Sequence, residues 1–155
     1  MVIRIGLISD THGLLRPQAL DFLQGSDAIL HAGDIIDPAT LKRLAGIAPL
    51  TSVRGNNDSG AWARALPEAI TVTFGGVAIH MLHDLKELAI DPVASGVRVV
   101  VTGHTHKPPC VERSGVLYVN PGAAGRRRFT LPVSVGELII ESGQASVRLV
   151  TLDIP

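Results

Sequence analysis

VIRIGLISDTH, residues 2–12, opens the chain with a run of apolar and β-branched residues that stops at polar ones. A short apolar run of this kind predicts a buried strand over residues 2–8. Asp10 and His12 follow that strand directly. Residues two apart in an extended segment point to the same side, so we expect the two side chains to bind one ion. The stretch therefore predicts a strand with metal ligands at its carboxyl end.

The first half of the chain continues with alternating helix and strand signals. We predict a short helix over residues 17–24, with Pro17 in its first turn, and strands over residues 28–31 and 50–54. Between those strands, Asp37 as N-cap and Pro38 open a helix that runs to residue 45 and stops at Gly46. Strand–helix–strand alternation with short connections predicts a parallel sheet with helices on its face.

The second half is dominated by hairpin signals. Paired strands are predicted on either side of three turns, and residues 97–101 form a further apolar, β-branched run. The turns are Gly75-Gly76, between residues 69–74 and 77–82; Ser114-Gly115, between 111–112 and 116–119; and Ser142-Gly143, between 133–140 and 146–152. We expect mixed and antiparallel sheet there. The fold class is therefore α/β, with two packed sheets in a single domain over residues 1–155.

Composition narrows the function classes. Hydrophobic residues make up 46% of the 155, but aromatic ones only 3%, so the core must be aliphatic. The 14 basic and 14 acidic residues cancel, which argues against binding to a nucleic-acid polymer or a membrane surface. The one cysteine, Cys110, excludes an internal disulfide and suits a reducing compartment. With neither a signal peptide nor a membrane-spanning run in the sequence, we expect a cytoplasmic protein.

Five of the predicted strands end in residue types that bind metals. These are Asp10 with His12, Asp34 after Gly33, Asn56 with Asn57 and Asp58, His83 with Asp84, and His104 with His106. Ligands bind beyond the carboxyl ends of strands in open α/β sheets, so these side chains are expected to meet. A carboxylate can bridge two ions. The mixture of nitrogen and oxygen donors suits Mn²⁺, Fe, Zn²⁺, Co²⁺ or Ni²⁺ better than Mg²⁺ or Ca²⁺.

Together these segments resemble the calcineurin-like metallophosphoesterases, and within them the small single-domain bacterial and archaeal phosphodiesterase branch. The matching segments are Asp10-x-His12, Gly33-Asp34, Gly55-Asn56-x-Asp58, His83 and Gly103-His104-Thr105-His106. Asn120-Pro121-Gly122-Ala123 is similar to that branch's Asn-Pro-Gly-Ser segment. The resemblance covers roughly residues 2–152 and implies a calcineurin-like sandwich of two mixed β-sheets flanked by helices.

The resemblance also implies a ligand set and a reaction. One metal would be held by Asp10, His12, Asp34 and His106, and the other by Asp34, Asn56, His83 and His104, with Asp34 as the bridge. Two divalent transition-metal ions are implied, with Mn²⁺ expected ahead of Fe, Zn²⁺, Ni²⁺ or Co²⁺. A metal-bridging hydroxide would then attack the phosphorus of a small phosphodiester. The catalytic positions implied are Asp34, Asn56, Asn57 and His104.

Three residues depart from the family pattern. Asn57 stands where many members have a His that serves the leaving group, and an amide cannot act as a general acid near neutral pH. The proton donor is therefore unassigned. Asp84 replaces the usual Gly, where it either orients a ligand or caps the following turn. Ala123 replaces Ser and removes one hydroxyl from its loop.

The remaining polar residues have predicted structural roles. They are His31 as a buried, hydrogen-bonded residue; His80 on the opposite face of its strand; Asp37 as a helix N-cap; and Asp58 as an acceptor for backbone amides of the Asn56 loop. Arg126, Arg127 and Arg128 either bind substrate phosphate or form a solvated basic turn; the sequence favours neither. Trp62 lines either a cleft or an interface.

Two alternative functions stay open. A phosphomonoesterase of the same fold is disfavoured by Asn57, because cleavage of an alkyl monoester benefits from a general acid. A non-catalytic scaffold, similar to the retromer-associated member of the family, is disfavoured by the intact ligand positions. Family analogy also implies a homodimer.

Overall fold

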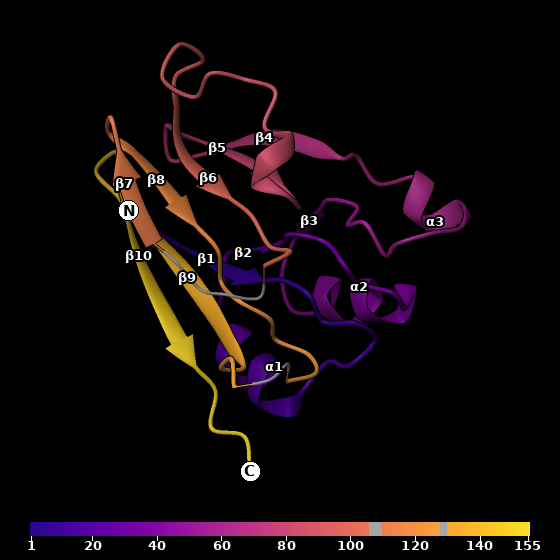
Figure 1. Cartoon of the computed structure of the whole chain (residues 1–155). Helices are drawn as coiled ribbons and strands as arrows, with labels where there is room; N and C mark the ends of the chain where they lie inside the picture. Colours follow the sequence, from indigo (N-terminus) through magenta and orange to yellow (C-terminus); the bar gives the residue numbers. More distant parts are fainter. Residues whose placement is uncertain (106–109, 128–129) are drawn as a thin grey trace.

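Two five-stranded mixed sheets pack face to face in the computed structural model, which describes residues 1–105, 110–127 and 130–155 (Figure 1). The first sheet has the order β10-β9-β1-β2-β3. Its strands are β1 (Val2–Ile8), β2 (Ala28–His31), β3 (Leu50–Ser52), β9 (Ser134–Glu141) and β10 (Gln144–Thr151). β1, β2 and β3 run parallel, whereas β9 pairs antiparallel with both β1 and β10.

The second sheet has the order β4-β5-β6-β8-β7. Its strands are β4 (Ala69–Phe74), β5 (Val77–Leu82), β6 (Val97–Val101), β7 (Cys110–Arg113) and β8 (Val116–Val119). β5, β6 and β8 are parallel to one another, and the antiparallel strands β4 and β7 form the two edges. The α/β class and the predicted mixture of strand directions are confirmed.

The core forms because side chains along each central strand point alternately to the two faces of the sheet. Ile5 and Leu7 of β1 face the second sheet, where they join Ile79 and Met81 of β5 in one buried cluster. The neighbouring residue Ile8 points the other way and packs in a separate cluster with residues of α1 and α2. Side chains of a strand alternate between its faces, so each central strand contributes to two apolar layers.

Helices α1 (Pro17–Leu23) and α2 (Pro38–Ala45) cover the outer face of the first sheet (Figure 1). Asp37 caps α2, as predicted, by accepting a hydrogen bond of 3.0 Å from the backbone N of Ala39. Two short elements were not predicted: α3 (Ala61–Arg64) and the 3₁₀ helix η1 (Leu85–Glu87). Both are shorter than the window over which a helical period becomes visible.

The predicted third strand is two residues too long. β3 ends at Ser52, because the backbone N of Arg54 turns away to donate to the carbonyl of Pro67 at 2.9 Å. No helix in the described part of the chain has the length and apolar character that a membrane crossing needs.

Arg4 ties β1 to β9 and to the end of α1. Its Nε lies 2.6 Å from Glu137 Oε2, and its two terminal nitrogens donate to the carbonyls of Phe22 and Gln24. Arg148 binds the other oxygen of Glu137 at 2.9 Å, but its side chain is 63% exposed, compared with 24% for Arg4. Burial acts to raise the pKa of Glu137, and the two arginines outweigh it, so that the pKa is lowered.

Arg4→Ala should therefore destabilise the fold much more than Arg148→Ala. The first leaves one oxygen of a buried carboxylate and two carbonyls without their donor, so the free energy of unfolding should fall by about 2–3 kcal/mol. The second removes an exposed pair, at a cost of about 1 kcal/mol or less. Urea denaturation of both variants measures the difference, and equal losses would contradict this account.

Candidate metal centre

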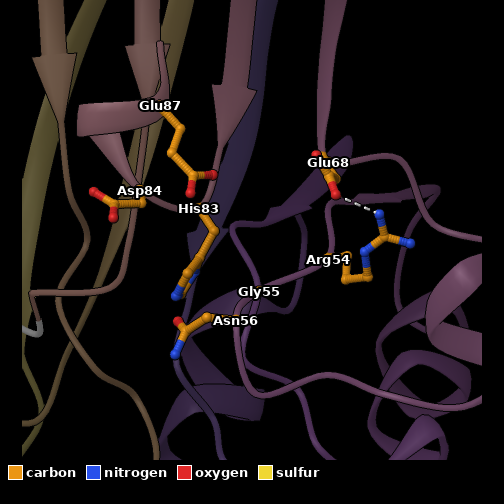
Figure 2. Close-up of a pocket in the computed structure, with 7 residues that line it drawn as sticks. All are labelled: Arg54, Gly55, Asn56, Glu68, His83, Asp84 and Glu87. Atoms are coloured by element: carbon orange, nitrogen blue, oxygen red, sulfur yellow. Dashed lines mark hydrogen bonds and ion pairs between the residues drawn. The ribbon is translucent and has the colours of Figure 1, made fainter.

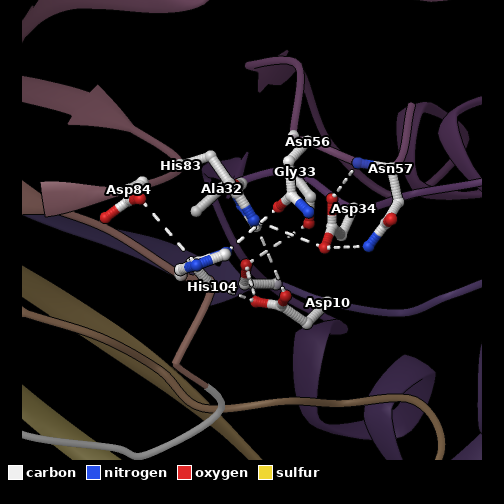
Figure 3. Close-up of polar contacts among 12 residues, drawn as sticks. Asp10, Ala32, Gly33, Asp34, Asn56, Asn57, His83, Asp84 and His104 are labelled. Atoms are coloured by element: carbon white, nitrogen blue, oxygen red, sulfur yellow. Dashed lines mark hydrogen bonds and ion pairs between the residues drawn. The ribbon is translucent and has the colours of Figure 1, made fainter. Parts of the chain in front are cut away.

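The candidate ligand residues directly follow the carboxyl ends of parallel strands in both sheets. Asp10 follows β1, Asp34 follows β2, Asn56 follows β3, His83 follows β5, and His104 follows β6. Figure 3 shows these five side chains gathered in one cluster, although they come from two different sheets. The described part of the chain thus brings six of the seven predicted ligand residues together, with His12 as the sixth.

Two imidazoles converge on the same carboxylate oxygen. His83 Nε2 lies 3.3 Å from Asp34 Oδ2, and His12 Nε2 lies 3.5 Å from that atom. The same two nitrogens are 4.0 Å and 3.7 Å from Asp10 Oδ1. Zn–N and Zn–O bonds are about 2.0–2.2 Å long, so donors that share one ion lie about 3–4 Å apart. The four nitrogen–oxygen distances, 3.3–4.0 Å, fall in that range.

Burial makes a cation at this place physically plausible. Asp10 is 0% exposed, Asp34 is 2% exposed and His83 is 5% exposed, and their ligand atoms lie within 4.8 Å of one another. Two carboxylates taken out of water side by side are costly unless positive charge compensates them. A divalent ion held between them would supply that charge.

His83 is oriented for coordination by a backbone contact. Its Nδ1 lies 2.7 Å from the carbonyl of Ala32, which fixes the proton on Nδ1 and turns Nε2 toward the two carboxylates. Nε2 is buried and makes no hydrogen bond with any described residue. A histidine that ligates a metal through one nitrogen ordinarily donates from the other in this way.

Electrostatics within the cluster favour bound positive charge. Burial acts to lower the pKa of His83, but Asp34 and Asp10 outweigh it and the pKa is raised. Burial likewise acts to raise the pKa of Asp34, but His83 and the backbone amide of Asn57 outweigh it, and that pKa is lowered. The carboxylates therefore favour the protonated form of His83, with which a metal ion has to compete.

Asn56 and His104 form the second part of the cluster. Asn56 Oδ1 lies 3.0 Å from His104 Nδ1, so both atoms face the same point (Figure 3). On its other side, His104 Nε2 lies 3.8 Å from Asp84 Oδ2. The second oxygen of Asp84 caps η1 by accepting from the backbone N of Lys86 at 3.1 Å. Asp84 thus serves both roles considered for it: it caps the turn and faces the ring of a candidate ligand.

Asn57 acts on Asp34. Its backbone N donates to Asp34 Oδ1 at 2.9 Å, and its side-chain Nδ2 donates to Asp34 Oδ2 at 3.0 Å. This clamp fixes the plane of the carboxylate that faces both imidazoles. The side-chain amide of Asn57 is therefore already bound to Asp34. Asn57 does not take the place of the histidine that protonates the leaving group in the family pattern.

The backbone of the ligand loops corrects one expectation. Asp10 and His12 were expected to share a side because their segment is extended, but their φ values are 52° and 46°, in the left-handed region. Asp34 and His104 also have positive φ, at 60° and 72°. Such conformations cost about 1–3 kcal/mol each and cluster at functional sites. The Asp10 side chain reaches the cluster because its loop hydrogen-bonds to the β2 loop, with Asp10 N 2.9 Å from Gly33 O.

Asp58 holds this strained loop in place. Its carboxylate accepts four backbone amides, at 2.8–3.0 Å, and it is 8% exposed. The donors are Asp34, Ile35, Ile36 and Gly55. The predicted role as an acceptor for backbone amides is confirmed, but three of the four amides belong to the Asp34 loop rather than to the Asn56 loop.

Asn120 is a positioning residue that the sequence analysis did not identify. Its Nδ2 donates to the carbonyl of Gly103 at 2.9 Å and to Thr105 Oγ1 at 3.0 Å, so it braces the His104 loop on both sides. The Asn-Pro-Gly segment at the end of β8 was the available signal. Gly103 is required there because a Cβ would lie 2.6 Å from Asp10 Oδ2.

His31 and His80 take the structural roles predicted for them. His31 is 0% exposed, accepts from the backbone N of Gly33 at 3.0 Å, and contacts Thr11 Oγ1 at 3.0 Å through Nε2. Burial lowers its pKa to about 4, despite nearby carboxylates that act to raise it. His80 lies on the other face of β5, where its Nδ1 contacts Thr71 Oγ1 at 2.8 Å.

The low pKa of His31 predicts acid sensitivity. A histidine of pKa 6.5 when unfolded and about 4 when folded contributes stability above pH 6.5 that is lost as the pH falls toward 4. The full shift corresponds to about 3 kcal/mol. In chelator, His31→Asn should flatten the fall in unfolding free energy between pH 6.5 and 4. An unchanged pH profile in the variant would contradict the assignment.

Several predicted residues lie outside this cluster or outside the described residues. His106 and Arg128 are among residues that the structure does not describe, so the fourth ligand of the first metal stays a prediction. Arg127 donates to the carbonyl of Ile154 at 3.3 Å and so contacts the carboxyl-terminal segment. Trp62 lies on α3, and Cys110 is exposed at the start of β7.

Known proteins share this sequence pattern and this fold. The profile of the calcineurin-like phosphoesterase superfamily domain matches residues 3–143. A protein of Methanothermobacter thermautotrophicus named "Probable metallophosphoesterase" is 30% identical over 97% of this chain and 94% of its own length. A solved archaeal phosphodiesterase superposes with a TM-score of 0.79 at 24% identity, over 97% of this chain and all of that one. Vacuolar protein sorting 29 of Cryptosporidium parvum superposes with a TM-score of 0.77 at 20% identity, over 99% of each chain.

Proposed function

This chain belongs to the calcineurin-like phosphoesterase superfamily, and from that premise we propose that it hydrolyses small phosphodiesters at a dinuclear metal centre. The observation that carries the proposal is the convergence of His12 Nε2 and His83 Nε2 on one oxygen of Asp34. A carboxylate flanked by two imidazoles supports a bridging role for Asp34, with one imidazole on each ion.

The proposed ligand sets follow from the cluster. Asp10, His12 and Asp34 would hold one ion, with His106 as a further ligand, and Asp34, Asn56, His83 and His104 would hold the other. The donors fit divalent transition metals, and we expect Mn²⁺. When bound, two such ions supply a strong nucleophile at neutral pH and stabilise the negative charge that develops on the phosphoryl oxygens.

The chain's own residues would keep this centre rigid during the reaction. Asn57 clamps both oxygens of Asp34, and Asp58 fixes the backbone on which Asp34 stands. Asp84 faces the distal nitrogen of His104. Positions held within fractions of an ångström are what metal-assisted displacement needs, because misplacement of the reacting groups is costly in rate.

Diesters are favoured over monoesters by two features of the chain. No imidazole stands at position 57 to protonate an alkoxide leaving group, and the amide there is bound to Asp34. The carboxylate of Asp84 beside the centre would also repel the second negative charge of a monoester. The scaffold alternative has support from the likeness to vacuolar protein sorting 29, but that likeness concerns the fold alone. The homodimer implied by family analogy stays a prediction.

Matched chromogenic substrates test the proposal. With Mn²⁺ present, kcat/KM for bis(p-nitrophenyl) phosphate should exceed that for p-nitrophenyl phosphate by about tenfold, about 1.4 kcal/mol, because Asp84 would repel the second negative charge of the monoester. Since p-nitrophenolate leaves without protonation, this ratio does not depend on a general acid. A ratio below one would favour the monoesterase. Metal-loaded protein that cleaves neither substrate would favour the scaffold.

A further inference from the structure

A small cavity opens beside the candidate metal centre. It has a volume of about 180 Å³, and two of its lining residues, Asn56 and His83, also belong to the metal cluster. The others come from the loop after β3, the start of β4 and the η1 turn: Arg54, Gly55, Glu68, Asp84 and Glu87 (Figure 2). A phosphodiester whose phosphorus lies at the metals would place one of its two ester arms here.

The size of this cavity limits the arm that it can enclose. Pockets that enclose larger organic ligands measure about 300 Å³ or more. A short alcohol of two or three carbons fits, whereas a nucleoside would extend out of the cavity.

The charge of the lining selects among short alcohols. Three carboxylates line the cavity, and apart from the proposed metal ligand His83, Arg54 is the one basic side chain among its lining residues, all of which the structure describes. Arg54 is neutralised by Glu68, whose Oε1 lies 2.7 Å from its Nη2. The carboxylates of Asp84 and Glu87 are the two that Arg54 does not neutralise, and they lie on the side of the cavity near His83 (Figure 2). This surplus of negative charge attracts a cation and repels a second anion.

His83 joins the cavity to the metal cluster. Its side chain is 5% exposed and lines the cavity, while its Nε2 lies 3.3 Å from Asp34 Oδ2 in the cluster. The cavity and the metal cluster therefore share a wall.

We propose that this cavity is a subsite for an ester arm that carries a primary ammonium group, such as 2-aminoethyl, and that Asp84 and Glu87 are its specificity-determining residues. The inference rests on the proposed function and names the substrate class of the same site. An ammonium offers three donors, which the two carboxylates can accept, and its positive charge offsets theirs. A choline-type head is less suited, because the lining holds no Trp, Tyr or Phe to face a quaternary ammonium.

Two isosteric diesters test the subsite by turnover. They are p-nitrophenyl 2-aminoethyl phosphate and p-nitrophenyl propyl phosphate, which differ by ammonium against methyl at the end of the arm. The wild-type protein with Mn²⁺ should prefer the first by about tenfold in kcat/KM, as expected for a pair of partly exposed carboxylates near the cation. In Glu87→Gln the preference should fall to about twofold. Glu112→Gln, on exposed strand β7, should keep it.

A second variant and a binding measurement make the outcome decisive. Glu68→Gln frees Arg54 toward the cavity, so it too should reduce the preference. Calorimetry on the metal-loaded protein measures binding without turnover. Phosphorylethanolamine should bind about tenfold more tightly than propyl phosphate, the same ratio as in kcat/KM. Equal binding of the two esters, or a Glu87→Gln variant that weakens both equally, would overturn the subsite. Absent turnover with this binding ratio intact would instead overturn the proposed function alone.

Discussion

Replacing Asp34 by Asn is expected to lower kcat/KM for bis(p-nitrophenyl) phosphate by about a thousandfold, equivalent to about 4 kcal/mol in the barrier. Asp34 is the residue on which both imidazoles converge, at 3.3 and 3.5 Å, so its loss would affect both proposed ions. An amide keeps the shape of the side chain but cannot bridge two cations. Steady-state kinetics and bound metal per chain measure the effect.

The fold of this variant should remain intact. Asp34→Asn removes a repulsion with Asp10 but also weakens the contacts with His83 and Asn57 that lower the pKa of Asp34, so in chelator the free energy of unfolding should fall by only about 1–2 kcal/mol. Asp37→Asn is the matched control in the same loop, because Asp37 caps α2 and touches none of the ligands. It should keep its activity within about twofold. An Asp34→Asn variant within tenfold of wild-type activity would contradict the bridging role.

Replacing Asp58 by Ala is expected to cause the largest loss of stability. Four backbone amides would lose their acceptor, three of them around the strained Asp34 at φ 60°. Buried amides left unsatisfied cost about 1–3 kcal/mol each, and one of the four lies at the exposed Ile36, where water can replace the carboxylate. We expect the free energy of unfolding to fall by about 3–5 kcal/mol in urea denaturation.

Asp58→Ala should also weaken the metal site without removing a ligand. Residues that orient ligands typically contribute 10- to 100-fold in metal affinity, so Mn²⁺ binding should weaken by about that factor. Asp37→Ala, which removes a single capping bond, should cost about 1 kcal/mol and leave Mn²⁺ affinity unchanged. If Asp58→Ala and Asp37→Ala were equally stable, Asp58 would not be the support that its four contacts indicate.

Local signals were sufficient to predict the elements that carry the site. β1, β2, β5 and β6 begin and end where their apolar runs do, and the polar residues that follow them meet because parallel strands place their carboxyl ends at one edge. Turn residues likewise predicted all three hairpins. These features depend on residues close together in sequence.

Features that depend on tertiary contacts were not predictable in the same way. The sequence did not indicate that β9 pairs with β1 or that β8 runs parallel to β6, because pairing partners are chosen by packing across the whole sheet. The left-handed backbone at Asp10 and His12 arises from hydrogen bonds to the β2 loop, which no local rule contains. Asn120 was recognisable as part of a motif, but its bonds to the His104 loop appear only in three dimensions.

Anomalous X-ray diffraction from a crystal of the Mn²⁺-loaded protein tests the dinuclear centre most directly. The account predicts two peaks, about 3.5–4 Å apart, on either side of the Asp34 carboxylate. One should lie beside Asp10 and His12, and the other beside Asn56, His83 and His104. A single peak, or peaks away from Asp34, would contradict it.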